Sequence, residues 1–335
     1  MLLVTACESG GDGARPTIDF GMPLRSIGVL DGRPDETFGV IGDLVIGAKG
    51  DLFVLDDQAK VVHRVRGDSA IERIGGPGGG PGEFTAPGAL WMQSATELVV
   101  ADGEAMRLSV FDVTVLPARH VADVRLAHFV EPGGNGCVME QHTYINAFDG
   151  THAIQVLDPA GNHVASISEV PIDTSLPPVL QRELQVVGGV GRLTCVPEED
   201  LLIFLPRWRA RVYVLSPTGD VQADWPLMEY EQFTAHQDAD GTTGFGPDPE
   251  TGEAHQGLGT TWLGANQFII QLGKIGDRRE REEGPVEHRL FDVGLGEIAR
   301  LRQPAPRFPV LRENAWYGYR NLPFPQVIVQ ALQTR

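Results

Sequence analysis

Short apolar runs recur in pairs along the chain, and their spacing predicts the architecture. Six β-type runs end at Val65, Phe111, Leu157, Leu215, Phe291 and Val329, and each follows a second run of the same character, such as DLFVLD or ELVVAD. The first three ends are 46 residues apart (111 − 65 and 157 − 111). A repeat of this length built from strands is typical of a β-propeller, in which each repeat forms one small sheet.

We therefore expect an all-β protein, a six-bladed β-propeller with four-stranded antiparallel blades. The expected blades span residues 38–75, 84–126, 129–168, 184–228, 256–303, and 307–332 together with 17–30. The run at 17–30 has no partner nearby and the last repeat is short, so the N-terminal strand is expected to join the last blade. Such closure removes the exposed sheet edges that favour aggregation. Residues 1–15 are assigned to a signal remnant and tether, and residues 16–335 to a single propeller domain.

The first repeat and the linker after it resemble the NHL-repeat type of six-bladed propeller. The repeat reads GDLVIGAKGDLFVLDDQAKVVHRV and the linker reads IGGPGGGPGEFTAP. The matching residues are Gly50, Asp51, Val54, Asp56, Val62, Gly76, Gly80, Pro81, Gly82, Glu83, Phe84 and Pro87. The C-terminal WYGYRNLPFPQVIV is similar to the closing blade of exported bacterial propeller lipoproteins. The resemblance is strong over 38–126 and weaker elsewhere, and it implies an architecture rather than a chemistry.

Charge and composition narrow the classes of partner. The chain holds 45 acidic and 27 basic residues, a formal net charge of −18. Binding to nucleic acid requires a basic face that neutralises phosphates, so no nucleic-acid partner is expected. The 41 Gly and 24 Pro fit a fold with many tight turns between short strands.

The N-terminus MLLVTAC resembles the end of a bacterial lipoprotein signal, in which the cysteine becomes the lipidated first residue. This resemblance implies lipidation at Cys7 and an exported protein anchored at the bacterial cell envelope. The polar, Gly-rich residues after Cys7 suit a flexible tether. Only six residues precede Cys7, whereas a signal peptide contains an apolar stretch of about 7–15 residues.

The two remaining cysteines, Cys137 and Cys195, each lie 20 residues before a repeat end (157 − 137 and 215 − 195). They are therefore expected at matching positions on the inner strands of neighbouring blades. An exported compartment permits a disulfide, but a bridge requires Cα atoms within about 7 Å. We expect buried free thiols here, with a disulfide as the alternative.

Long segments are predicted on one face, which we call the top face. It carries the turns between the second and third strands of each blade and the connections between blades. The unusual segments are GGPGGGPGEF after blade one, EVPIDTSLPPVLQRE after blade three, residues 229–257 after blade four, and GKIGDRREREEGP within blade five. Because loops of more than about 12–15 residues are uncommon in compact domains, we expect a rim around a central depression.

The best candidate ligand-binding residues on this face are Arg207, Trp208 and Arg209, which replace the Asp56-Asp57-Gln58 turn of blade one. Indole rings stack on flat ligands and guanidinium groups bind carboxylates or phosphates in a forked geometry. A solvated turn with the Trp packed between blades is the alternative interpretation.

Five further candidates lie in the long segments. His236, Asp238 and Asp240 belong to a sequence that resembles part of a calcium loop. Such a loop usually ends with a bidentate Glu at position 12, and here that position is Pro249. We therefore expect an acidic loop without a metal site, with calcium binding as the alternative. Lys274 and Arg278 belong to a run of mixed charge that is typical of a solvent-facing loop.

The sequence favours an exported, lipid-anchored propeller that binds a ligand or protein through its top face, without catalysis or a cofactor. The expected partner is an envelope protein, a peptide or a glycan, and membrane contact is expected through the lipid anchor only. An alternative is a propeller enzyme, either a metal-dependent lyase or a lactonase-like hydrolase, with its site at the central channel. Few polar residues are assigned to the inner strands: Glu140, Gln141, His142 and Thr194. A third possibility is a structural scaffold in an envelope assembly.

Overall fold

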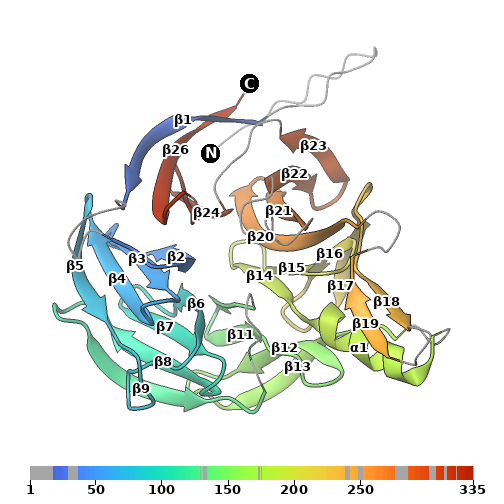
Figure 1. Ribbon diagram of the computed structural model, residues 1–335, viewed down its shortest axis with the longest axis horizontal. Coiled ribbons are helices and arrows are strands. Elements are labelled where there is room, and N and C mark those ends of the chain that lie inside the picture. The colour runs from blue at the N-terminus through green and yellow to red at the C-terminus, as the bar shows by residue number, and fades with distance from the viewer. Residues whose placement is uncertain are drawn as a thin grey trace.

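The structure is a computed structural model. It describes residues 18–28, 37–128, 130, 134–172, 174, 176–237, 242–247, 252–275, 286–301, 307–312, 315–321 and 323–334. Six four-stranded antiparallel sheets are arranged around a central axis as a six-bladed propeller (Figure 1). The predicted fold class and blade number are confirmed. Most observed blade ends lie within about three residues of the expected spans, whereas blades 3 and 4 begin seven residues later than expected, at Gly136 and Gly191.

The first three blades follow one another directly along the chain. Blade 1 contains β2 (Ile41–Ile46), β3 (Leu52–Asp56), β4 (Val61–Arg66) and β5 (Ser69–Ile74). Blade 2 contains β6 (Pro87–Met92), β7 (Glu97–Asp102), β8 (Arg107–Asp112) and β9 (Arg119–Arg125). Blade 3 contains β10 (Gly136–Met139), β11 (His142–Asn146), β12 (His152–Leu157) and β13 (His163–Glu169).

The last three blades carry additional elements. Blade 4 contains β14 (Gly191–Val196), β15 (Leu201–Pro206), β16 (Arg211–Leu215) and β17 (Val221–Pro226). Blade 5 contains β20 (Ala254–Gly264), β21 (Gln267–Ile275), β22 (Val286–Asp292) and β23 (Gly296–Leu301). Blade 6 contains β24 (Arg307–Arg312), β25 (Ala315–Arg320), β26 (Gln326–Thr334) and β1 (Ile18–Ile27). Helix α1 (Pro178–Gly189) precedes blade 4, and a hairpin of β18 (Thr234–Gln237) and β19 (Thr243–Gly246) precedes blade 5.

The near-continuous apolar runs are explained by packing on both faces of each blade. Successive residues of a strand point to opposite faces. In β3, Phe53 and Leu55 pack in the cluster shared with blade 2, whereas Leu52 and Val54 pack in the cluster shared with blade 6. Every residue of β3 is buried, while the outer strand β9 is mostly exposed or half-buried. Among the described residues, six hydrophobic clusters join the six pairs of neighbouring blades.

The ring is closed by the two ends of the chain. Strand β1 pairs antiparallel with β26, from Ile18 opposite Thr334 to Ile27 opposite Val327. Figure 1 shows the blue β1 beside the red β26. The predicted closure of the last blade by the N-terminal strand is therefore confirmed.

Acidic side chains fix the connections that enter the inner strands. The carboxylate of Asp56, at the end of β3, accepts hydrogen bonds from the backbone N–H groups of Gly39, Val40 and Ala59. Asp102 holds the same position in blade 2 and accepts hydrogen bonds from the backbone of Thr85, Ala86 and Ala105. The aspartate of the repeat motif thus ties the end of the second strand to the chain that enters the blade.

The long Pro-rich connection after blade three differs from the expected loop because it runs into helix α1. Pro178 lies in the first turn of this helix. Proline suits that position since it has no N–H to leave unpaired and its φ angle matches a helix. The segment at 229–257 likewise contains the β18–β19 hairpin, with Thr234 opposite Gly246. Both insertions lie side by side near blade 4 (Figure 1).

Candidate functional site

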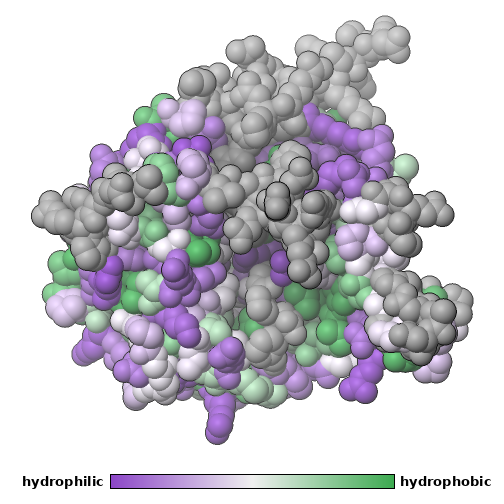
Figure 2. All heavy atoms as spheres, in the orientation of Figure 1, coloured by the Kyte–Doolittle hydropathy of each residue, from purple (hydrophilic) through white to green (hydrophobic). Residues whose placement is uncertain are grey.

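An apolar hollow lies on the top face between blade 4 and the two insertions. Its volume is ≈ 670 Å³, within the range of about 300–1,000 Å³ that is usual for small-molecule sites. We call it the aromatic groove, and its main lining residues are Ile172, Leu176, Leu184, Val187, Trp208, Arg209, Arg211, Phe233 and Phe245. Figure 2 shows apolar side chains gathered where α1 lies.

Three aromatic rings form one side of the groove. The ring centroids of Trp208 and Phe233 are 4.1 Å apart, and those of Phe233 and Phe245 are 5.1 Å apart with the rings stacked. Trp208 comes from the turn between β15 and β16, whereas Phe245 comes from β19. The hairpin therefore completes an aromatic surface that blade 4 alone does not form.

Arginine side chains surround Trp208 and differ in what they bind. The Arg207 guanidinium lies 4.8 Å from the Trp208 ring centroid and donates to Oε1 of Gln256. Arg211 makes two hydrogen bonds to the Asp224 carboxylate, at 2.6 and 2.8 Å. Arg209 lines the groove and donates from Nη2 to the carbonyl oxygen of Pro171. Of the two arginines in the groove, Arg209 is therefore the one without a carboxylate partner among the described ion pairs.

Among the other predicted ligand-binding residues whose side chains the structure describes, Lys274 does not line this groove. Lys274 lies near the end of β21 and forms an ion pair with Glu253. Its Nζ also lies 3.9 Å from Oε2 of Glu231. The hydrogen bond and charge of Glu253 raise the pKa of Lys274 above its usual value. His236 lies in β18. Asp238, Asp240 and Arg278, with Cys7, lie outside the described residues.

A second hollow runs along the propeller axis. This central channel has a volume of ≈ 230 Å³ and is lined by residues of the inner strands of all six blades, from Asp43 of β2 to Val310 of β24. In the part of the chain that the structure describes, no group of three His, Cys, Asp or Glu side chains could hold a metal ion.

An ion pair crosses this channel. Oδ2 of Asp43, on β2 of blade 1, lies 3.6 Å from Nη1 of Arg192, on β14 of blade 4. Blades 1 and 4 face each other across a six-membered ring, and both side chains are buried. Burial raises the pKa of Asp43, although the charge of Arg192 and hydrogen bonds from the backbone N–H groups of Leu90 and Leu44 act in the opposite direction.

A further carboxylate lies beside this ion pair. Asp57 follows β3 on the top face, and its carboxylate lies over Gly42, where an added Cβ would come within 2.1 Å of Oδ1. Although Asp57 is exposed as a residue, desolvation of its carboxyl group by the neighbouring chain, followed by the charges of Asp43 and Asp56, raises its pKa to about 7.

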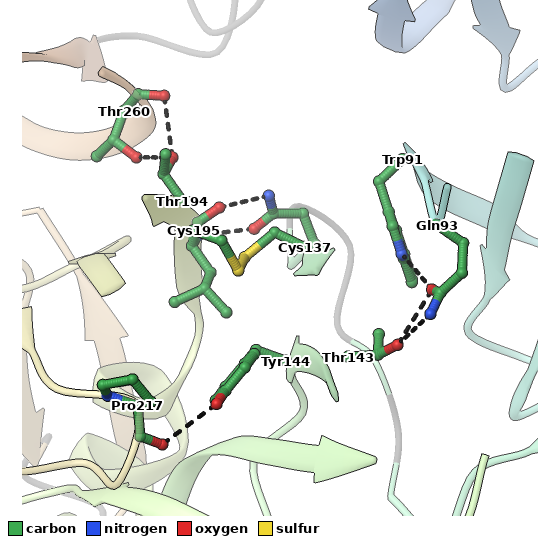
Figure 3. Close-up of a disulfide and its surroundings, with 11 residues drawn as sticks. Trp91, Gln93, Cys137, Thr143, Tyr144, Thr194, Cys195, Pro217 and Thr260 are labelled. Carbon is green, nitrogen blue, oxygen red and sulfur yellow. Dashed lines mark hydrogen bonds between the residues drawn. A yellow bond between two sulfur atoms is a disulfide. The ribbon is translucent and has the colours of Figure 1, made fainter. Parts of the chain in front are cut away.

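The channel wall contains a disulfide between Cys137 of β10 and Cys195 of β14, with Cα atoms 5.7 Å apart. The expectation of free thiols was therefore wrong. Inner strands of neighbouring blades converge toward the axis, which brings matching positions within disulfide reach. Figure 3 shows this disulfide beside Thr194, whose hydroxyl is hydrogen-bonded to Thr260 of β20, with Trp91 of β6 nearby.

The expected polar residues of the inner strands were only partly correct. Thr194 lines the channel. Glu140 and Gln141, however, form the turn between β10 and β11, and His142 begins β11. Asp43 and Arg192 were missed, because each is a single charge within a short apolar strand. A signal was present, since a charged residue between buried positions of an inner strand must face the axis or a neighbouring blade.

Comparisons with known proteins support the fold. No family model and no curated protein matches the chain. A DUF4221 family member from Bacteroides vulgatus superposes with a TM-score of 0.63 at 10% identity, covering 96% of this chain and 99% of that one. A candidate exported protein from Bacteroides fragilis superposes with a TM-score of 0.57 at 8% identity, covering 96% and 95%.

An enzyme also shares this architecture. Virginiamycin B lyase from Staphylococcus aureus superposes with a TM-score of 0.52 at 10% identity, covering 92% of this chain and 99% of the lyase. Likeness at such low identity concerns the fold alone, since one fold hosts many functions. Among the described residues, no helix has the length and apolar character needed to cross a membrane.

Proposed function

We propose that the protein is an exported binding module whose aromatic groove takes an anionic amphiphile, such as a carboxylate with an alkyl or aromatic body. The observation that carries this proposal is the combination, in one hollow of ≈ 670 Å³, of aliphatic and aromatic walls with Arg209. Ligand sites are mostly apolar with a few well-placed polar groups that orient the ligand.

Each part of the ligand follows from a part of the groove. The aliphatic side chains of Leu184 and Val187 and the rings of Trp208 and Phe233 supply an apolar surface for the ligand body. Burial of apolar surface contributes about 25 cal/mol per Å² removed from water. The Arg209 guanidinium supplies a charge-assisted hydrogen bond for an anionic end. A glycan suits these walls less well because its many hydroxyl groups would lose hydrogen bonds to water.

The two insertions support a role beyond ring closure. Strands β1 and β26 close the propeller without α1 or the β18–β19 hairpin. Both insertions nevertheless contribute walls to the same groove, through Leu184 of α1 and Phe245 of β19. A structural scaffold would not require this hollow.

Export with lipid attachment at Cys7 forms part of the proposal. It is supported by the lipoprotein-like MLLVTAC sequence and by the C-terminal WYGYRNLPFPQVIV, which is similar to the closing blade of exported bacterial propeller lipoproteins. The test is metabolic labelling in bacteria with an alkyne analogue of palmitate. Labelling of the wild type and its loss in Cys7→Ser supports the anchor, and equal labelling of both proteins contradicts it.

The binding test uses 1-anilinonaphthalene-8-sulfonate, an aromatic anion whose fluorescence rises at apolar surfaces. We expect dodecanoate to displace it from the wild type, and Trp208→Ala to weaken its affinity by about tenfold, or 1.4 kcal/mol. Arg119→Gln is the matched control because Arg119 lies exposed on β9, in blade 2. Unchanged affinity in Trp208→Ala, or a melting point raised by glycans or peptides and not by dodecanoate, would contradict the proposal.

The metal-dependent enzyme at the central channel stays a prediction. Fold likeness to a lyase at 10% identity does not transfer an activity. Metal analysis of the purified protein tests this alternative, since a stoichiometric metal would support it.

A further inference from the structure

We propose that the central channel is a second binding site, separate from the aromatic groove, for a small zwitterion of the α-amino acid class. In this arrangement the ligand carboxylate pairs with Arg192 and the ligand ammonium pairs with Asp43. The inference rests on the cross-channel ion pair and the cavity around it, and it does not depend on the proposed function of the groove.

The two charges are carried by opposite walls. Asp43 is held on β2, where its Oδ1 accepts a hydrogen bond from the N–H of Leu44 at 3.0 Å and its Oδ2 accepts one from the N–H of Leu90 at 3.3 Å. Arg192 is held on β14 of the opposite blade. The carboxylate therefore cannot move freely toward the guanidinium, because two backbone groups of two blades fix its position.

The two charges lie at ion-pair distance from each other and line the same cavity. Their closest atoms are 3.6 Å apart, whereas a charge-assisted N–H···O bond is about 2.7–2.9 Å long. A buried ion pair is strongly stabilised only when its geometry is good, because both ions have lost their hydration. A zwitterion lying alongside the pair, in the channel, would set its carboxylate against Arg192 and its ammonium against Asp43 without changing the net charge of the site.

The local charges favour a ligand that carries an ammonium group. Asp57 does not line the channel, but its carboxylate lies over Gly42, the neighbour of Asp43 in the sequence, and acts electrostatically on Asp43. The charge of Arg192 acts on both Asp43 and Asp57. Two carboxylates thus lie within electrostatic range of Arg192, and a ligand ammonium beside Asp43 would be attracted by both.

The size and lining of the channel limit the ligand. Its ≈ 230 Å³ corresponds to about seven or eight water molecules at about 30 Å³ each, which suits a small amino acid and not an oligopeptide or a sugar chain. The wall also offers the hydroxyl groups of Thr194, Thr260 and Thr261 and the indole of Trp91. An indole face can attract an ammonium group through a cation–π interaction.

The experiment measures binding to the full chain by isothermal titration calorimetry. The probes are L-alanine, L-serine and L-threonine as zwitterions, L-alaninamide as a cation without a carboxylate, and propionate as an anion without an ammonium. We expect at least one zwitterion to bind, and the cation and the anion to bind more than tenfold more weakly. Trp208→Ala should leave this binding unchanged, so that failure of the groove and failure of the channel site are distinguishable.

The matched variants are Asp43→Asn, Arg192→Gln and the double variant, which replaces the ion pair by two amides of similar shape. We expect each single variant to lose zwitterion binding by at least tenfold. A single variant leaves one buried charge without its partner and could fail to fold, as judged by circular dichroism. In that case zwitterion binding is measured on the double variant, which leaves neither charge of the pair in the channel.

Three results would overturn the proposal. The first is the absence of binding for all three zwitterions in the wild type. The second is equal affinity for L-alanine and L-alaninamide, which would show a site for amines, and the third is retained binding in the folded double variant.

Discussion

Asp56 and Asp57 are neighbours in the sequence, yet their carboxylates have opposite environments. Asp56 is buried and accepts hydrogen bonds from the backbone of Gly39, Val40 and Ala59. Asp57 lies over Gly42 on the top face, close to other carboxylates. One aspartate therefore stabilises the repeat as a fixed anion, while the other holds a proton more tightly than an ordinary carboxyl group.

The first prediction concerns the pH dependence of Asp57. Its pKa rises from 3.8 to about 7 on folding, so the folded state binds this proton more tightly than the unfolded state between these values. The stabilising contribution is complete below pH 3.8 and is lost as pH rises through about 7. In Asp57→Asn, the free energy of unfolding measured by urea titration should fall less between pH 4 and pH 8 than in the wild type. Parallel pH profiles of the two proteins would contradict the shift.

The second prediction concerns Asp56. Burial alone would raise its pKa, but hydrogen bonds involving His63 and the backbone of Gly39, Ala59 and Val40 lower it to about 2. Its contribution is present above pH 3.8 and is lost as pH falls through about 2. Asp56→Ala should therefore reduce the free energy of unfolding at pH 7 by about 1–3 kcal/mol, because buried N–H groups lose their acceptor. A change of less than 0.5 kcal/mol, the usual size at an ordinary surface position, would argue against this role.

The third prediction concerns ring closure. The side-chain amide of Asn321 in blade 6 accepts a hydrogen bond from the N–H of Ile41 at 2.8 Å and donates one to its carbonyl oxygen at 3.1 Å. Asn321→Leu removes the hydrogen-bond partners of both backbone groups of the buried residue Ile41. We expect a loss of about 1–3 kcal/mol in the free energy of unfolding. Asn321→Asp keeps the acceptor and should cost less. Hydrogen exchange should show faster exchange of the Ile41 amide in Asn321→Leu. Unchanged exchange would show that Asn321 does not hold the start of β2 in place.

The fourth prediction concerns the disulfide. It closes a loop between positions 58 residues apart, and the chain-entropy relation gives a stabilisation of about 4 kcal/mol for such a loop. The variant Cys137→Ser/Cys195→Ser should unfold at a lower urea concentration by a comparable free energy. Cys7→Ser is the control, and it should retain the wild-type midpoint. Detection of two additional free thiols in the oxidised wild type by mass spectrometry would show that the bridge is absent.

The sequence predicted the architecture well because the propeller depends on a pattern that repeats. Buried residues on both faces of strands such as β3 require apolar runs at a regular spacing, so the number of blades and their boundaries follow from the spacing. Closure by β1 was also predictable, since a strand without a neighbour and a short last repeat complement each other. These inferences required no knowledge of individual contacts.

The candidate site was less predictable because it depends on contacts between distant segments. Trp208 and Arg209 were recognised as an unusual turn, but Phe233 and Phe245 join them only through the β18–β19 hairpin. Helix α1 was missed because its prolines resemble those of a loop. The pairing of Asp43 with Arg192 likewise depends on which blades face each other, a property of the closed ring and not of either strand.

The most direct test of the proposed function compares two ligands that differ mainly in the sign of their charge. Isothermal titration calorimetry of dodecanoate and dodecyltrimethylammonium, below their micelle concentrations, measures the dissociation constant of each for the wild type and for Arg209→Gln. We expect the wild type to bind dodecanoate at least tenfold more tightly, a difference of about 1.4 kcal/mol, and Arg209→Gln to lose this preference. Equal affinity of the wild type for both ligands, or a preference that persists in Arg209→Gln, would contradict the assignment of the aromatic groove as a site for anionic amphiphiles.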